Sequence, residues 1–535
     1  MHNTYDEVPY PNLSHSNTHP DHLATIATLL GVDAPPVDCC RVLELGCAGG
    51  ANLLPMAYGL PESEFLGIDA SSRQISDGRD TVKQLGLHNL CLRSMDILDV
   101  SDALGQFDYI IAHGVYSWVP SSVQDKILQI CNHNLTPHGV AYISYNTYPG
   151  WHLMSIIRDA MRYRTHNIFD PQQRAAVARS TLEFLAKSVP VERPHGAFVQ
   201  SYATFLSDQA KRIDAESDAF LLHDELEDIN QPVYFHEFAK RAADNGMQYL
   251  AEADFQSVFT DNLGSETAQY LEDGASDIVE LEQMTDFVRN RMFRRTLLCH
   301  DDIPITRILD TRNALNLYVA SRAVPVAAQP NTLTRSVEEF RGPDGATLSI
   351  DHPISKAAMI HLSDISPSAI GIPELCAAAC RRLDADGQHS PNPDDSDILM
   401  ANLLKAFSYS SQLAEFHVHV PAMLQPAIDR QPIASPVARH HALESDVVTN
   451  LWHERVRVDS LRRYVLCRLD GSHTWDDLLD DLIGQAQSGQ LEVKRDGSPI
   501  SDPEEVKAIL SRNIVSVLNW AARSALLTQP PAERA

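Results

Sequence analysis

The sequence predicts an α/β protein whose main part is a doubly wound sheet, followed by smaller units toward the C-terminus. Over roughly the first 150 residues, short apolar runs alternate with amphipathic segments of helical length. The first apolar run ends in a glycine-rich turn, and the next two runs each end in an aspartate. This alternation is typical of a parallel sheet that carries helices on both faces.

The length of the chain indicates how many domains it holds, and its net charge restricts the kinds of partner that it can bind. The chain has 535 residues, and its 43 lysines and arginines against 71 aspartates and glutamates give a formal net charge of −28. This length suggests about three or four domains. An acidic body repels polyanions at long range, so we expect no nucleic-acid partner. The sequence holds no run of about 18 apolar residues, so we also expect no membrane insertion.

The N-terminus and the cysteines predict the compartment. Residues 1–20 are polar and lack the basic stretch and apolar core of a secretory signal. The nine cysteines are an odd count at loose spacings, which does not suggest a disulfide framework. We therefore expect a cytoplasmic protein.

The first strand and its turn carry the first chemical signal. Residues 41–50 read Arg-Val-Leu-Glu-Leu-Gly-Cys-Ala-Gly-Gly, and a helix-compatible run follows at 52–60. A second strand is predicted at 65–69 and ends in Asp69. A carboxylate at this place can accept hydrogen bonds from both hydroxyls of a ribose, as in dinucleotide sites.

The spacing of the turn indicates which nucleotide would bind. The turn reads Glu44-x-Gly46-x-Ala48-x-Gly50, which departs from the dinucleotide pattern G-x-G-x-x-G. An acid two residues before the first glycine would repel a pyrophosphate but attract the ammonium and sulfonium of S-adenosylmethionine (AdoMet). We therefore interpret the turn as an AdoMet site, the alternative being a glycine-rich turn without a ligand.

The alternation then continues through three more predicted strands. A helix at 71–86 leads to a strand at 90–96, and further strands follow at 107–113 and 139–145. The strand at 90–96 ends in Asp96, a second acid at the same edge of the sheet. Four motifs are therefore in register over about 105 residues: the glycine turn, Asp69, Asp96 with Ile97, and residues 112–114 at the end of the fourth strand.

With these motifs in place, the N-terminal part resembles the class I AdoMet-dependent methyltransferases, which have a Rossmann-like seven-stranded sheet. The resemblance implies that Asp69 binds the ribose and that Asp96 and Ile97 bind the adenine. It also implies that Ala112 and His113 form the strand edge beside the methyl donor. The full set of implied AdoMet-binding residues is Glu44, Gly46, Cys47, Gly50, Asp69, Ala70, Gln74, Asp96, Ile97, Ala112 and His113.

The last two strands of such a sheet are displaced along the sequence. Strands at 247–252 and 294–300 are predicted only after a long helical tract. We expect a methyltransferase core at 1–151 and 231–302, with a helical insertion at 152–230 and a second helical excursion at 254–292. The insertion would cover the site or form a dimer interface, although its amphipathic stripes are equally compatible with ordinary core packing.

Two further units are predicted beyond residue 302. Residues 303–425 hold a hairpin turned at 343–345 and three helices, which suggests an α+β middle domain. Residues 437–535 hold predicted helices at 456–468, 474–487 and 502–526 and a short strand, which suggests a winged-helix-like domain. Without a basic recognition helix, this domain is expected to contact protein or to pack against the rest of the chain, and not to bind DNA.

Several segments outside the general fold indicate a narrower family. They lie at residues 5–10, 146–151, 222–225, 251–255 and 291–298. Together they resemble bacterial methyltransferases that carry a methyltransferase regulatory domain, among them the rickettsial-type outer-membrane-protein lysine methyltransferases. The resemblance implies methyl transfer from AdoMet to lysine side chains of a protein, and a helical insert that forms a homodimer.

An acceptor side is expected where strands four and five end, because ligands bind at the carboxyl ends of the strands in open α/β sheets. Aromatic faces there would hold an ammonium, and a histidine could relay a proton. Packing in the core or under a lid is the alternative for each. The candidates are Tyr10, His19, His113, Tyr116, Trp118, Tyr148 and Trp151.

Other functions and sites are weighed against this one. A small-molecule N- or O-methyltransferase and a non-catalytic AdoMet-binding regulatory protein fit the same motifs. The histidines at 15, 19 and 22 and the pair at 417 and 419 have no cysteine pair with them, so we expect no metal site.

Overall fold

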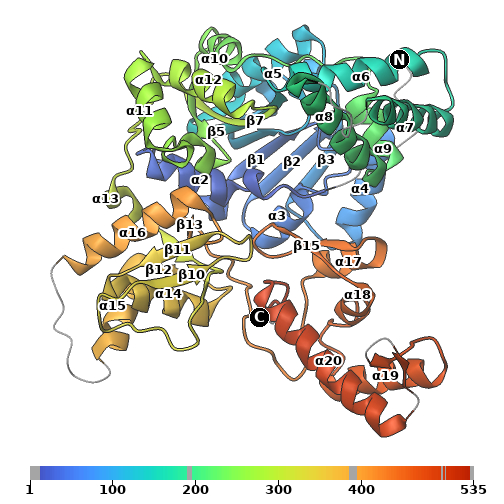
Figure 1. The fold of residues 1–535 in the computed structure, drawn as a ribbon, viewed down its shortest axis with the longest axis vertical. Coiled ribbons are helices and arrows are strands. Elements are labelled where there is room, and N and C mark those ends of the chain that lie inside the picture. The colour runs from blue at the N-terminus through green and yellow to red at the C-terminus, as the bar shows by residue number, and fades with distance from the viewer. Residues whose placement is uncertain (1–12, 190–195, 385–393, 496–497, 501, 530–535) are drawn as a thin grey trace.

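The centre of the molecule is a seven-stranded mixed sheet with the strand order β3-β2-β1-β4-β5-β7-β6 (Figure 1). The computed structural model describes residues 13–189, 196–384, 394–495, 498–500 and 502–529. β7 runs antiparallel to both β5 and β6. The predicted class I sheet is therefore confirmed, including the two strands that follow the helical tract. The strands are β1 Arg41–Leu45, β2 Glu64–Asp69, β3 Leu90–Ser94, β4 Phe107–Ala112, β5 Leu135–Asn146, β6 Met247–Glu252 and β7 Phe293–His300.

Helices cover both faces of this sheet because successive side chains of each buried strand point to opposite sides. Val42 of β1 belongs to the apolar cluster on one face, with helices α2 and α3. Its neighbour Leu43 belongs to the cluster on the other face, with α5 and α10. The helices around the sheet are α2 Pro20–Leu29, α3 Leu53–Gly59, α4 Ser72–Gln84, α5 Ser121–Asn134, α10 Phe235–Ala243, α11 Ser265–Gly274 and α12 Ile278–Arg289.

The segment between β5 and α10 is helical and has an apolar core of its own. Ile157, Met161, Leu182 and Leu206 are buried in this core. Figure 1 shows these helices together at one end of the sheet, above β3 and α4. The segment consists of α6 Trp151–Thr165, α7 Pro171–Ser188, α8 Ala197–Ala215, α9 Asp218–Phe220 and a π-helical turn at Leu221–Glu225. Among the residues that the model describes, no helix is both long and apolar enough to cross a membrane.

The described part of the middle unit combines two small sheets with four helices. The predicted hairpin is confirmed, since β10 Glu338–Arg341 pairs antiparallel with β11 Thr347–Ile350 around a turn with Gly345 at φ +86°. The apolar cluster of this unit is continuous with that of α2 and the central sheet. Its other elements are α13 Thr311–Ala314, β8 Tyr318–Ala320, β9 Val324–Pro325, α14 Pro353–Ile365, β12 Ile370–Gly371, α15 Ile372–Leu383, α16 Asp395–Tyr409 and β13 Glu415–His417.

The C-terminal unit has a separate apolar cluster and lies below α3 in Figure 1. The helix expected at 456–468 begins only at Ser460, because residues 455–457 pair with 447–449 as a short hairpin. This hairpin was not predicted. The elements are α17 Pro436–Glu444, β14 Val447–Thr449, β15 Arg455–Arg457, α18 Ser460–Leu466, α19 Trp475–Gln487, β16 Lys494–Arg495, β17 Ser498–Pro499 and α20 Pro503–Arg523.

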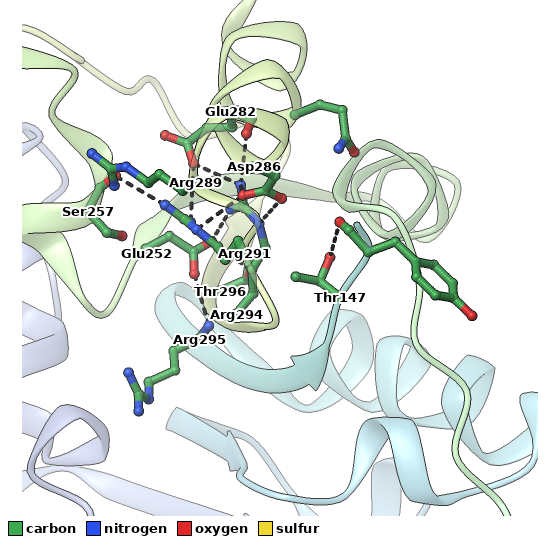
Figure 2. A network of polar contacts seen from close by, with 12 residues as sticks. Thr147, Glu252, Ser257, Glu282, Asp286, Arg289, Arg291, Arg294, Arg295 and Thr296 are labelled. Carbon is green, nitrogen blue, oxygen red and sulfur yellow. Dashed lines mark hydrogen bonds and ion pairs between the residues drawn. The ribbon is translucent and has the colours of Figure 1, made fainter. Parts of the chain in front are cut away.

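A buried ionic network holds the displaced end of the sheet together (Figure 2). The guanidinium of Arg294 on β7 has no exposed surface and contacts three acids. Its nitrogens lie 2.6 Å from Glu252 of β6, and 3.0 Å and 2.8 Å from Glu282 and Asp286 of α12. Arg294 also stacks 3.8 Å from the ring centre of Phe235 on α10. One side chain thus joins two strands and two helices.

Removing this guanidinium should leave the buried carboxylate of Glu252 without its cation, and Glu282 and Asp286 with Arg291 alone. We expect Arg294→Ala to destabilise the protein by about 3–5 kcal/mol, which is typical when one partner of a buried ion pair is deleted. The control is Arg341→Ala, which removes an exposed pair with Glu339 and should cost about 1 kcal/mol or less. Urea unfolding followed by circular dichroism measures both. Equal midpoints for the two variants would contradict this assignment.

Candidate active site

The site lies at the carboxyl ends of β1, β2 and β4, and its base is the loop after β1. Gly46 and Gly50 adopt φ values of +72° and +78°, a left-handed region that favours glycine. A Cβ on Gly46 would lie 2.5 Å from Cγ2 of Val115, which follows β4. The backbone N–H groups of Gly46 and Cys47 both donate to the carbonyl of Ile68 on β2. The predicted turn is thus fixed between two strands at close approach.

The two predicted acids after β2 and β3 are held in different ways. The carboxylate of Asp69 accepts hydrogen bonds from the backbone N–H groups of Ala48 and Ser71, at 2.9 Å and 2.8 Å. Asp96 is exposed and accepts from the N–H of Leu98 at 2.9 Å. Backbone donors therefore fix the direction in which Asp69 presents its carboxylate.

Other predicted residues surround these acids. Ala70 is exposed just after Asp69, and Ile97 is half-buried beside Asp96. Gln74 is buried at the start of α4, and its Nε2 has no hydrogen-bond partner among the described residues. Ala112 is fully buried at the end of β4. A buried polar atom without a partner is rare in folded proteins and indicates a ligand or water.

Glu44 is the buried carboxylate of the site. Its Oε1 accepts a hydrogen bond from Asn52 Nδ2 at 2.8 Å. Its Oε2 is buried and has no hydrogen-bond partner in the described part of the chain. Burial raises the pKa of Glu44 to about 7, although the bond from Asn52 opposes this shift. A cationic ligand would satisfy the carboxylate in its ionised form.

Asn52 connects Glu44 to two distant parts of the chain. It accepts hydrogen bonds from the backbone N–H of His15, at 2.8 Å, and from His453 Nε2, at 2.9 Å. Its Nδ2 also donates to Thr18 at 3.0 Å. We call residues 15–19 the N-terminal arm. Asn52 was not predicted as a site residue, although its position before α3 without a capping bond is a weak signal.

A pair of histidines lies beside the turn. The rings of His15 and His113 stack with centres 3.7 Å apart, and His113 Nδ1 lies 2.9 Å from the hydroxyl of Tyr142. Burial lowers the pKa of His15 to about 4 and that of His113 well below its usual range, with additional lowering by Arg295 and Arg455. Both imidazoles are therefore neutral near pH 7. His113 was predicted as a site residue. His15 was weighed only as a metal ligand, and no metal site was expected there.

The structure places the predicted aromatic candidates in packing contacts. Tyr116 is fully buried and packs on Tyr145 and Phe238. The rings of Trp118 and Trp151 meet edge to face, 6.4 Å apart, in the apolar core of the helical insertion. No ring contact between described residues joins either group to His113.

Two further candidates make their contacts away from the histidine pair. Tyr148 stacks on His152 at 4.1 Å. His19 accepts a hydrogen bond from the backbone N–H of Asp21 and caps α2. Tyr10 lies outside the described residues. For the aromatic candidates the acceptor role stays a prediction, and the contacts correspond to the packing alternative.

The residues at this site fit AdoMet. The glycines of the turn allow the backbone to approach a ligand closely. Glu44 has a buried carboxylate oxygen without a hydrogen-bond partner among the described residues. The carboxylate of Asp69 is oriented by a backbone N–H group. Negative charge near an ammonium and a sulfonium is favourable. A seven-stranded sheet with such a site defines a class I methyltransferase.

Comparisons with known proteins agree with this class. Residues 37–175 match the family model "Methyltransferase domain". Residues 217–300 match "Predicted methyltransferase regulatory domain", and residues 430–526 match "PKMT, C-terminal winged helix domain". The predicted methyltransferase, regulatory region and winged helix are thus confirmed.

Relatives along the whole chain define the family. An uncharacterized protein of Rickettsia prowazekii is 33% identical over 533 residues, which cover 98% of this chain and 94% of that protein. The structure of PKMT2 from Rickettsia typhi is 31% identical with a TM-score of 0.85, and covers 97% of this chain and 100% of that one. Its complex with AdoHcy is 30% identical, with a TM-score of 0.86 and the same coverage. The chain belongs to the family of these proteins and is an AdoMet-dependent methyltransferase.

The raised pKa of Glu44 should make cofactor binding depend on pH. A bound cation favours the ionised carboxylate, so below about pH 7 binding must release a proton. We expect AdoMet affinity to rise with pH between about 5.5 and 7, by up to about tenfold per unit. Glu44→Gln should bind more weakly and lose this dependence. Calorimetry across pH measures both, and a variant with the slope of the wild type would disprove the assignment.

Proposed function

We propose that this enzyme transfers methyl groups from AdoMet to lysine side chains of a protein acceptor. The observation that carries the proposal is the likeness to PKMT2 over 97% of the chain, which includes the middle and C-terminal units as well as the sheet. PKMT denotes a protein lysine methyltransferase. A small-molecule enzyme would need only the sheet and a cover for its pocket.

The cofactor would be held by the residues at the ends of β1 to β4. Glu44 would face the ammonium and sulfonium, and Asp69 would accept from the ribose hydroxyls. Asp96 and Ile97 would border the adenine. When bound, AdoMet supplies an electrophilic methyl group, and the residues of the chain supply its orientation and the exclusion of water. The remaining contacts are assigned to Gly46, Cys47, Gly50, Ala70, Gln74, Ala112 and His113.

An acceptor lysine has to lose its proton before it can attack, because its usual pKa is about 10.4. The surroundings of His15 and His113 favour this loss. Burial and the charges of Arg295 and Arg455 lower the pKa of both imidazoles, and the same field would lower the pKa of an amine placed there. The neutral rings add no charge that would oppose a cationic methyl donor.

The helical insertion is proposed as the interface of a homodimer. Several of its aromatic side chains are exposed, with Phe169 at 91% and Phe198 at 84%. Large exposed apolar side chains on one unit of a protein mark interaction surfaces. The predicted domain division, with the core at 1–151 and 231–302, and the cytoplasmic location remain proposals of the same kind.

The pH below which kcat falls, the acid limb of the kcat profile, should depend on the positive charge near the acceptor amine. Removing a nearby cation stabilises a protonated amine, so Arg295→Gln should move the acid limb of kcat upward by about one pH unit. Arg341→Gln, an exposed arginine of the middle unit, should leave the profile unchanged. The profile is measured with labelled methyl donor at saturating AdoMet. An unshifted limb would remove Arg295 from the acceptor site.

The proposed activity is tested by incubating the protein with labelled AdoMet and a bacterial lysate, followed by mass spectrometry of the labelled proteins. We expect methyl groups on lysine Nζ. Asp69→Ala should abolish both AdoMet binding and labelling, because the ribose would lose its acceptor, while circular dichroism shows an unchanged fold. Wild-type protein that binds AdoMet but labels no lysine would overturn the proposal.

A further inference from the structure

A second polar cavity lies on the other side of the N-terminal arm. It has a volume of about 170 Å³ and is bordered by the arm and the start of α2, by β13 of the middle unit, and by the turn at 451–454 of the C-terminal unit. Ser16, Asn17 and His19 of the arm line it. The backbone of His15 and the side chain of Thr18 instead bond to Asn52 on the cofactor side. The arm therefore separates this cavity from the methyl-donor site.

The charge of the cavity is negative. Asp21, Asp254, Glu415 and Glu454 all line it. Asp21 is paired with His417 Nδ1 at 2.7 Å, and Glu454 is paired with Arg322. The side chain of Glu415 is half-buried, its Oε2 lies 4.0 Å from Nε2 of His417, and burial raises the pKa of Glu415 to about 7. A nearby cation stabilises the ionised form of a carboxylate whose pKa is raised by burial.

His417 provides an independent sign of a ligand. Only 5% of the residue is exposed, and its Nε2 has no hydrogen-bond partner among the described residues. This nitrogen lies 4.0 Å from Oε2 of Glu415, and the imidazole stacks on the indole of Trp452 with ring centres 4.3 Å apart. Nδ1–H is donated to Asp21. Burial lowers the pKa of His417, but the charges of Asp21, Glu415 and Glu454 outweigh burial and raise that pKa. Nε2 remains a buried polar atom without a partner at the wall of the cavity.

The chemistry of the lining favours an organic cation over a metal ion. Although four histidines border the cavity, no three histidine, cysteine or acidic side chains in the described ranges are placed to hold a metal. An ammonium donates three hydrogen bonds and needs acceptors at several angles. Glu415 supplies one of them, and Trp452, which also lines the cavity, presents an aromatic ring of the kind that attracts cations.

We propose that this cavity binds a basic side chain, a lysine or an arginine, of the acceptor protein, at a position other than the lysine that is methylated. The inference rests on the proposed function for the identity of the partner. It gives the middle and C-terminal units a direct part in substrate recognition, because β13 supplies Glu415 and the turn at 451–454 supplies Trp452. Acceptors with a second basic residue near the target lysine would then be preferred.

Direct binding of a probe tests the site without any methyl transfer. Tetralysine is titrated into the protein at about pH 8, where Glu415 is ionised, and binding is followed by calorimetry in about 0.15 M salt. We expect Glu415→Gln to weaken tetralysine binding by about fivefold or more, because a half-buried charged acceptor is lost. Glu444→Gln removes an exposed acid of α17 and the same net charge, and should bind tetralysine like the wild type.

The binding measurements distinguish a failure of this proposal from a damaged cofactor site and from a failure of the proposed function. Equal tetralysine affinity in wild type and Glu415→Gln overturns the proposal, as does a site that binds spermidine but not tetralysine. AdoHcy affinity is expected to be unchanged in both variants, which shows that the cofactor site is intact. Failure of the lysine-methylation proposal would appear only in the labelling experiment and would leave the Glu415-dependent peptide binding in place.

Where an acceptor protein is in hand, the kinetic constants extend the test. Glu415→Gln should raise KM by about fivefold with kcat unchanged, because the basic residue is bound equally in the ground state and the transition state. An acceptor whose neighbouring basic residue is replaced by glutamine should show the same rise, and the two changes together should add nothing further. A fall in kcat at constant KM would contradict a binding role.

Discussion

The side-chain amide of Asn52 joins three segments that are far apart in sequence. Its NH₂ group donates to Glu44 and to Thr18, and its oxygen accepts from the backbone of His15 and from His453, which lies 401 residues away. With both ends of the amide engaged, the buried carboxylate of Glu44 has a fixed position. The methyl-donor site is therefore complete only when the N-terminal arm and the C-terminal unit are both in place.

Strand β7 links the buried ionic network to the proposed acceptor side of the site. Successive residues of a strand face opposite sides, so Arg294 enters the acidic cluster while Arg295 points away from it (Figure 2). Arg295 lies over the ring of Phe293, and Phe293 in turn contacts His113. The buried cluster thus fixes the strand that carries a cation toward the histidine pair. This is a physical reason for the regulatory region to be part of the sheet.

Local patterns were sufficient to predict the sheet, the glycine turn and the acids at 44, 69 and 96, because strand period, turn chemistry and strand ends are encoded over a few residues. The contacts of Asn52 with His15 and His453 could not be predicted, since they depend on how distant units dock. Trp118 and Trp151 were expected at the acceptor side because they follow strands four and five. Both also pack on the apolar core of the helical insertion, and sequence position alone does not distinguish a pocket wall from such a core. Their acceptor role therefore stays a prediction.

The two polar sites share the N-terminal arm, and this has an energetic consequence. The arm is held on one face by Asn52, and on the other face its residues line the acidic cavity. The free energy of the contacts that hold the arm at Asn52 therefore also helps to fix the arm residues that line the cavity. The net charge of −28 steers basic partners in general, whereas the cavity between three units of the chain supplies the selectivity.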